Sequence, residues 1–110
     1  MDGNEYQRLA NRTINKKLSR MENEYHALHG LTSEIGELHD IYQKKYQGHF
    51  VDFTHAKKEL GDILWFIAEY CTSMGWYMND IMQMNIDKLK ARYPEGFDSE
   101  KSLNRKEGDI

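Results

Sequence analysis

The chain is organised around the stretch LTSEIGELHDIYQKKYQGHFVDFTHAKKELGD, from Leu31 to Asp62. It contains two acidic pairs, Glu34-x-x-Glu37 and Glu59-x-x-Asp62, with 21 residues between them. Each pair lies in a segment whose apolar residues recur at helical spacing, and residues three apart share one face of a helix. The stretch therefore predicts two successive helices that each present a pair of carboxylates on a defined face.

The first member of each acidic pair falls within the apolar arc of its helix. On a wheel of about 100° per residue, Glu34 lies between Leu38 and Ile41, and Glu59 projects beside Phe66. The second members of the pairs, Glu37 and Asp62, lie at the edges of the apolar arcs. Carboxylates on a core-facing stripe are costly and repel one another unless a cation neutralises them. One such pair alone would be read as solvated charge, but two pairs on successive antiparallel helices favour a metal site.

Oxygen ligands alone indicate a hard divalent cation, Mg²⁺ first and Mn²⁺ as the other candidate. A di-iron carboxylate bundle is a more distant alternative, because the Glu-x-x-His repeats that build such centres are missing. The predicted metal ligands are Glu34, Glu37, Glu59 and Asp62.

Composition restricts the class of protein. The chain has 110 residues, enough for one domain, and its net charge of −3 argues against binding a nucleic-acid polymer or an anionic membrane. The longest apolar run, Ile63 to Ala68, is too short to span a bilayer, and the N-terminus has no apolar signal region. The single Cys71 rules out an internal disulfide framework. We expect a cytoplasmic protein.

Apolar periodicity predicts an all-α fold without strands. A first helix near 4–28 is expected to end at Gly30, and a second to occupy about 31–46. The third runs from a cap at 52 or 54 to about 73, and the fourth from 77 or 80 to 92. We expect a four-helix bundle protomer over 1–96, followed by an arm or tail at 97–110. The third helix has more apolar surface than one small bundle covers, which predicts a dimer or a dimer of dimers.

A second polar cluster lies on the predicted fourth helix. Asn85, Lys88 and Arg92 fall within roughly 60° of one another on the wheel, beside its apolar strip. Two cations and an amide suit the oxygens of a polyphosphate. Taken alone, this cluster is better explained as a basic helix end that complements the dipole. Next to an acidic metal site, the interpretation as a phosphate site gains weight.

The acidic pattern resembles that of the MazG-like nucleoside triphosphate pyrophosphohydrolases of the all-α NTP pyrophosphatase superfamily. Their motif is Glu-Glu-x-x-Glu, a variable spacer and Glu-x-x-Asp. Here Ser33 replaces the first glutamate. The stretches Glu5–Thr13 and Asn85–Phe97 also resemble the compact single-domain members. The motif residues present in this chain are Glu34, Glu37, Glu59 and Asp62.

The resemblance implies Mg²⁺-dependent hydrolysis of nucleoside triphosphates, NTP or dNTP, to the monophosphate and pyrophosphate. The role that it suggests is nucleotide-pool sanitation. It implies that the four carboxylates hold the metal, with Glu37 as the general base. Asn85, Lys88 and Arg92 would bind the leaving pyrophosphate. The competing hypothesis is a non-catalytic helical module that binds a nucleotide or a partner. The base and sugar of the substrate are not specified by any residue pattern.

Overall fold

The computed structural model describes residues 1–110, which form helices and no strand-built sheet. The α-helices are α1 (Gly3–Ala10), α2 (Arg20–Gln43), α3 (Phe53–Met74), α4 (Met78–Arg92) and α5 (Ser99–Leu103), with 3₁₀ turns η1 (Asn11–Thr13) and η2 (Lys44–Gln47). The all-α prediction is confirmed. None of these helices combines the length and apolar character needed to cross a membrane.

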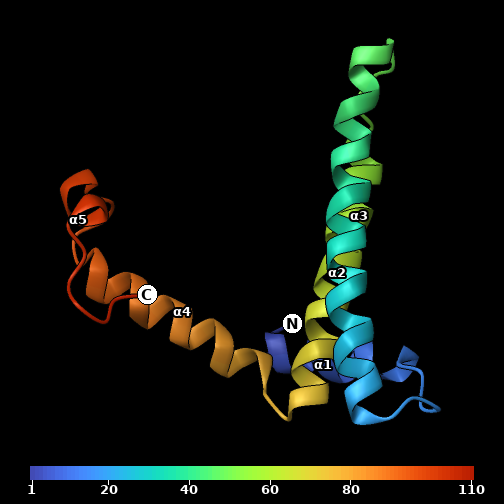
Figure 1. The fold of residues 1–110 in the computed structure, drawn as a ribbon, viewed down its shortest axis with the longest axis horizontal. Helices are drawn as coiled ribbons and strands as arrows, with labels where there is room; N and C mark the ends of the chain where they lie inside the picture. Colours follow the sequence, from blue (N-terminus) through green and yellow to red (C-terminus); the bar gives the residue numbers. More distant parts are fainter.

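Helices α2 and α3 form a long antiparallel hairpin, the main body of the molecule (Figure 1). The Ser19 side chain accepts a hydrogen bond from Glu22 N, and the Glu22 carboxylate accepts one from Ser19 N, so a capping box starts α2. Asp52 caps α3 by accepting hydrogen bonds from the amides of Thr54 and His55. Gly75, with a φ of 73°, ends it in the left-handed conformation that glycine adopts without steric cost.

A hydrogen bond to a buried carboxylate joins the two helices of the hairpin. Glu69 of α3 is fully buried, and both of its carboxylate oxygens lie 2.9 Å from Nδ1 of His26 on α2. A buried carboxylate without a partner would be strongly destabilising, so this contact favours the observed pairing of α2 with α3. The His26 ring also lies 5.8 Å from the ring of Phe66.

The prediction that Gly30 ends a helix is wrong, because α2 runs through it without a break. A Cβ atom at Gly30 would overlap the ring of Phe66 on α3. Gly30 therefore allows α2 to pack closely against Phe66 of α3. The expected helix at 4–28 is instead broken between Ile14 and Ser19, where the capping box begins α2. The Ser19-x-x-Glu22 pattern carries this signal in the sequence.

Replacing Gly30 with alanine is expected to destabilise the protein by about 1–3 kcal/mol, because Phe66 must leave its position for the methyl group to fit. Gly36 is the matched control: it lies on the same helix, and a Cβ there meets nothing within 4 Å. Gly36→Ala should therefore stabilise by roughly 0.5–1 kcal/mol through helix propensity. Urea unfolding of both variants checks the opposite signs. Equal stabilisation by both would contradict the packing role of Gly30.

Helix α1 packs at the open end of the hairpin and holds the turn that leads into α4. The buried amide of Gln7 donates to Thr72 Oγ1 and to Trp76 O, and its oxygen accepts from Met78 N at 2.9 Å. These bonds satisfy the amide on both sides and fix the start of α4. The small core at this junction contains Ala10, Ala68, Cys71 and Met78.

The expectation of a four-helix bundle protomer is wrong for a single chain. Helix α1 has only eight residues, and α4 packs against α1 and then runs away from the hairpin (Figure 1). The radius of gyration is 17.4 Å, against about 13 Å for a compact domain of this size. Only 12 of 110 residues are buried, and each of the helices α2, α3 and α4 has large apolar side chains that are exposed.

Candidate metal centre

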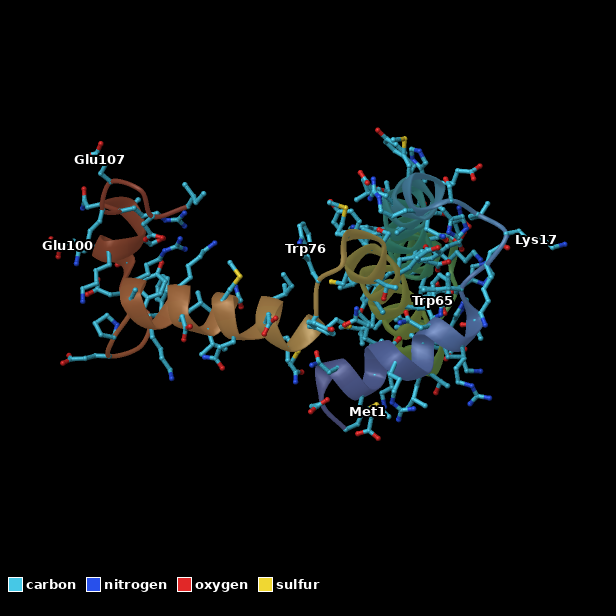
Figure 2. All side chains as sticks on the ribbon, turned by 90° about the horizontal axis from the view of Figure 1, so that it is seen from below. Met1, Lys17, Trp65, Trp76, Glu100 and Glu107 are labelled. Carbon is cyan, nitrogen blue, oxygen red and sulfur yellow. The ribbon has the colours of Figure 1, made fainter.

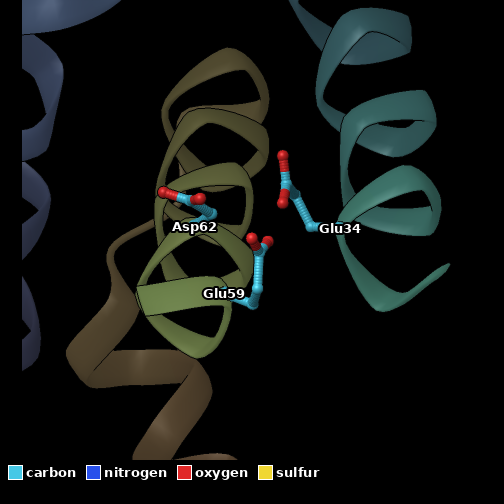
Figure 3. Close-up of side chains that lie close together, drawn as sticks. All are labelled: Glu34, Glu59 and Asp62. Atoms are coloured by element: carbon cyan, nitrogen blue, oxygen red, sulfur yellow. The ribbon is translucent and has the colours of Figure 1, made fainter. Parts of the chain in front are cut away.

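Three carboxylates converge between α2 and α3, near the middle of the hairpin (Figure 3). Glu59 and Asp62 are one turn apart on α3, and Glu34 faces them from α2. One carboxylate oxygen from each residue lies within 4.8 Å of the others. The contact between Gly30 and Phe66 lies one turn from this cluster on both helices, so the close packing there sets the spacing across which the three carboxylates meet.

The cluster has no cationic side chain to neutralise it. None of the three residues pairs with a lysine or arginine; the one basic contact is His55 Nε2, 3.0 Å from Glu59 Oε1. The second oxygen, Glu59 Oε2, is buried without a hydrogen-bond partner. A buried, unpartnered carboxylate oxygen beside two more carboxylates is what a bound cation would satisfy.

The pKa of Glu34 reflects this concentration of negative charge. It rises from 4.5 to about 7, first because a proton on Glu34 offers a hydrogen bond to Glu59, and then because of burial. The charges of Glu59, Asp62 and Glu37 raise it further. Proximity of like charges disfavours the ionised form, and a divalent cation reverses that preference. Oxygen donors converging in this way fit a Mg²⁺ or Mn²⁺ ion better than zinc.

Glu37, the fourth predicted ligand, lies outside the group of three. It is exposed on α2, one turn further along from Glu34. Its charge nevertheless contributes to the raised pKa of Glu34, which places it within electrostatic reach of the cluster.

A single chain does not bring the predicted phosphate-binding residues to the acidic cluster. Asn85, Lys88 and Arg92 lie on α4, which runs away from the hairpin beyond the turn at Trp76 (Figure 2). Asn85 and Lys88 are exposed. Arg92 is held by two hydrogen bonds to the carboxylate of Asp109.

Two residues near the cluster were not predicted from sequence. His55 orients Glu59 from the preceding turn of α3, and the i,i+4 spacing of the two residues is the signal for this contact. Tyr6 approaches from α1: its hydroxyl lies 3.5 Å from Gly61 O, and burial, followed by the charge of Asp62, raises its pKa. No pattern in the sequence connects Tyr6 to this site, because the contact depends on how α1 crosses the hairpin.

Comparison with known proteins agrees with this geometry. Residues 22–97 match the family model described as the MazG nucleotide pyrophosphohydrolase domain. The chain belongs to this family. The matched residues extend from the first turn of α2 to just beyond α4, and they include all the predicted metal- and phosphate-binding residues.

A curated relative is the Gene 37 protein of Mycobacterium phage L5, which is 26% identical over 72 residues. The alignment covers 61% of this chain and 63% of the phage protein, so the chain spans somewhat under two thirds of that relative's length. No solved structure matches the chain significantly.

Proposed function

We propose that this chain hydrolyses nucleoside triphosphates, NTP or dNTP, to the monophosphate and pyrophosphate in the presence of Mg²⁺. The observation that carries the proposal is the convergence of Glu34, Glu59 and Asp62 around a buried, unpartnered carboxylate oxygen. Membership of the MazG nucleotide pyrophosphohydrolase family supports the class of reaction. Nucleotide-pool sanitation in the cytoplasm is the role we assign to such an activity.

Glu34, Glu59 and Asp62 would hold the metal, with Glu37 joining them as the fourth ligand or acting on the attacking water. A bound divalent cation would offset phosphate charge and lower the pKa of a water molecule. Glu37 is exposed and without an ion-pair partner, which suits a base that accepts the proton of water attacking the α-phosphorus. The bond from the α-phosphorus to the bridging oxygen breaks, and pyrophosphate leaves. His55 keeps the Glu59 carboxylate oriented.

We further propose that the active assembly is a dimer or a dimer of dimers, in which a second copy covers the hairpin. Leu60 and Leu64 are about half exposed and lie on α3, the helix that also contains Glu59 and Asp62. A helical hairpin with so little buried surface has a strong hydrophobic reason to associate. A second copy would also bring an α4, with Asn85, Lys88 and Arg92, toward the acidic cluster. Sedimentation of the full chain as a monomer at micromolar concentration would contradict the assembly.

The reaction is tested by its products. Incubation of the full chain with Mg²⁺ and each of a panel of NTPs and dNTPs should give equal amounts of monophosphate and pyrophosphate, resolved by ion-exchange chromatography. Release of orthophosphate and diphosphate would contradict cleavage between the α- and β-phosphates. Tight nucleotide binding without turnover across the whole panel would favour the competing hypothesis of a non-catalytic binding module.

A further inference from the structure

A cationic cleft lies at the far end of α4, away from the acidic cluster, between that helix and the arm formed by residues 97–110 (Figure 2). Its volume is about 420 Å³, within the range of small-ligand sites. Its lining contains five cationic and two acidic side chains, so it has a net charge of +3 in a chain whose net charge is −3. The cations are Lys88, Arg92, Lys101, Arg105 and Lys106.

The carboxylate of Asp109, in the arm, lies among these cations and is bound by Arg92. Arg92 Nε lies 2.8 Å from Asp109 Oδ2, and Arg92 Nη2 lies 2.7 Å from Asp109 Oδ1. The Arg92 side chain is only 8% exposed. The hydrogen bonds from Arg92, and then the charges of Arg92, Arg105 and Lys88, hold the pKa of Asp109 below its usual value. Cations from both α4 and the arm therefore act on this one carboxylate.

The arrangement suits a phosphate group as well as a carboxylate. The guanidinium fork binds either in the same bidentate geometry, and lysines supply point charges to the remaining oxygens. The two acidic side chains of the cleft, Glu107 and Asp109, leave a net charge of +3 without a counter-ion. A di- or triphosphate carries several negative charges and would balance it. Asp109 accepts two hydrogen bonds from Arg92, whereas it accepts none from the other four cations, which can bind a phosphate group.

We propose that Asp109 is an intramolecular competitor for the polyphosphate that Lys88 and Arg92 would bind under the proposed function. A di- or triphosphate displaces Asp109 from Arg92 and is then held by Lys88 and Arg92 of α4 and by Arg105 of the arm. The choice of a polyphosphate as ligand rests on the proposed function. The affinity for polyphosphate is therefore lower than it would be without Asp109, because Asp109 must leave Arg92 before the phosphate can bind.

Binding of sodium pyrophosphate to the metal-free full chain, measured by calorimetry in divalent-free buffer, tests the proposal. Asp109→Asn should bind pyrophosphate about 5-fold or more tightly than wild type, since the competitor is removed. Glu100→Gln removes the same charge from an exposed arm position outside the cleft and should change affinity by less than about 2-fold. Arg105→Ala should weaken binding, and amide NMR shifts should lie within residues 88–109.

Several results would overturn the proposal. Unchanged or weaker binding by Asp109→Asn would mean that Asp109 only braces the arm, and unchanged binding by Arg105→Ala would exclude the arm from the site. Shifts confined to residues near Glu34 would place the ligand elsewhere, and tighter binding of a single-stranded oligonucleotide than of pyrophosphate would assign the cleft to nucleic acid. No turnover occurs in this measurement, so a chain that binds pyrophosphate but never hydrolyses NTP would contradict the proposed function alone.

Discussion

Glu34→Gln and Asp62→Asn are each expected to lower kcat/KM for Mg²⁺-dependent NTP hydrolysis by at least about 10³-fold, equivalent to roughly 4 kcal/mol of transition-state stabilisation. Each substitution keeps the shape of the side chain and removes one charged oxygen from the three-carboxylate cluster. With fewer anionic ligands, the metal binds more weakly and the remaining carboxylates orient it poorly. Pyrophosphate release under saturating Mg²⁺ measures the effect.

The control for these variants is Glu95→Gln, which removes one negative charge from an exposed position beyond α4. It should retain activity within about 2-fold, as an isolated surface charge contributes little. Circular dichroism and sedimentation should show all three variants as helical as wild type and equally assembled. Full activity in either Glu34→Gln or Asp62→Asn, with the fold intact, would exclude the cluster as the catalytic metal centre.

The same assay distinguishes the role of Glu37 from that of the converging carboxylates. A residue acting as the base should lose turnover when changed to glutamine but keep Mg²⁺ affinity, whereas a ligand should lose both. Glu37 lies outside the group of three, so we expect Glu37→Gln to change Mg²⁺ affinity less than Glu34→Gln does. Equal loss of Mg²⁺ affinity in the two variants would make Glu37 a metal ligand.

The acidic cluster could be predicted because the position of each carboxylate depends on the residue pattern of a single helix. Glu34 and Glu59 each lie in the apolar arc of one helix, and the antiparallel pairing of α2 with α3 brings them face to face. Helix ends at Asp52 and Gly75 could be predicted for the same reason, since a cap depends on a few neighbouring residues.

Contacts between distant segments could not be predicted in the same way. Glycine is a residue type that commonly ends helices, which is why the sequence predicts a helix end at Gly30. Gly30 lies within α2 because the ring of Phe66 on α3 packs against it. The direction of α4 depends on the buried amide of Gln7, whose partners are more than 60 residues away in sequence. The pairing of Arg92 with Asp109 depends in turn on how the arm folds back onto α4.

Lowering the pH of the metal-free chain from 8 to 5.5 should stabilise wild type relative to Glu34→Gln. The folded-state pKa of Glu34 is about 7, against 4.5 for the free group, so the folded state binds more protons between these values. Stability from this group therefore falls as pH rises from about 4.5 to 7, by less than about 3 kcal/mol once solvent screening of this partly exposed carboxyl is included. Glutamine does not titrate, so Glu34→Gln should be the more stable protein at pH 8 and lose that advantage at pH 5.5.

Magnesium should reverse this order at high pH, because a protonated Glu34 cannot act as a ligand while an ionised one can. At a free Mg²⁺ concentration of about 100 times Kd, wild type should gain roughly 2.7 kcal/mol at pH 8, with a much smaller gain at pH 5.5 and in Glu34→Gln. Thermal unfolding of both proteins at the two pH values, with and without Mg²⁺, measures all of these differences. An Mg²⁺ stabilisation of wild type that is equal at both pH values would mean that the ion binds without Glu34. A pH-independent difference between the metal-free proteins would mean that the neighbouring carboxylates do not raise the pKa of Glu34.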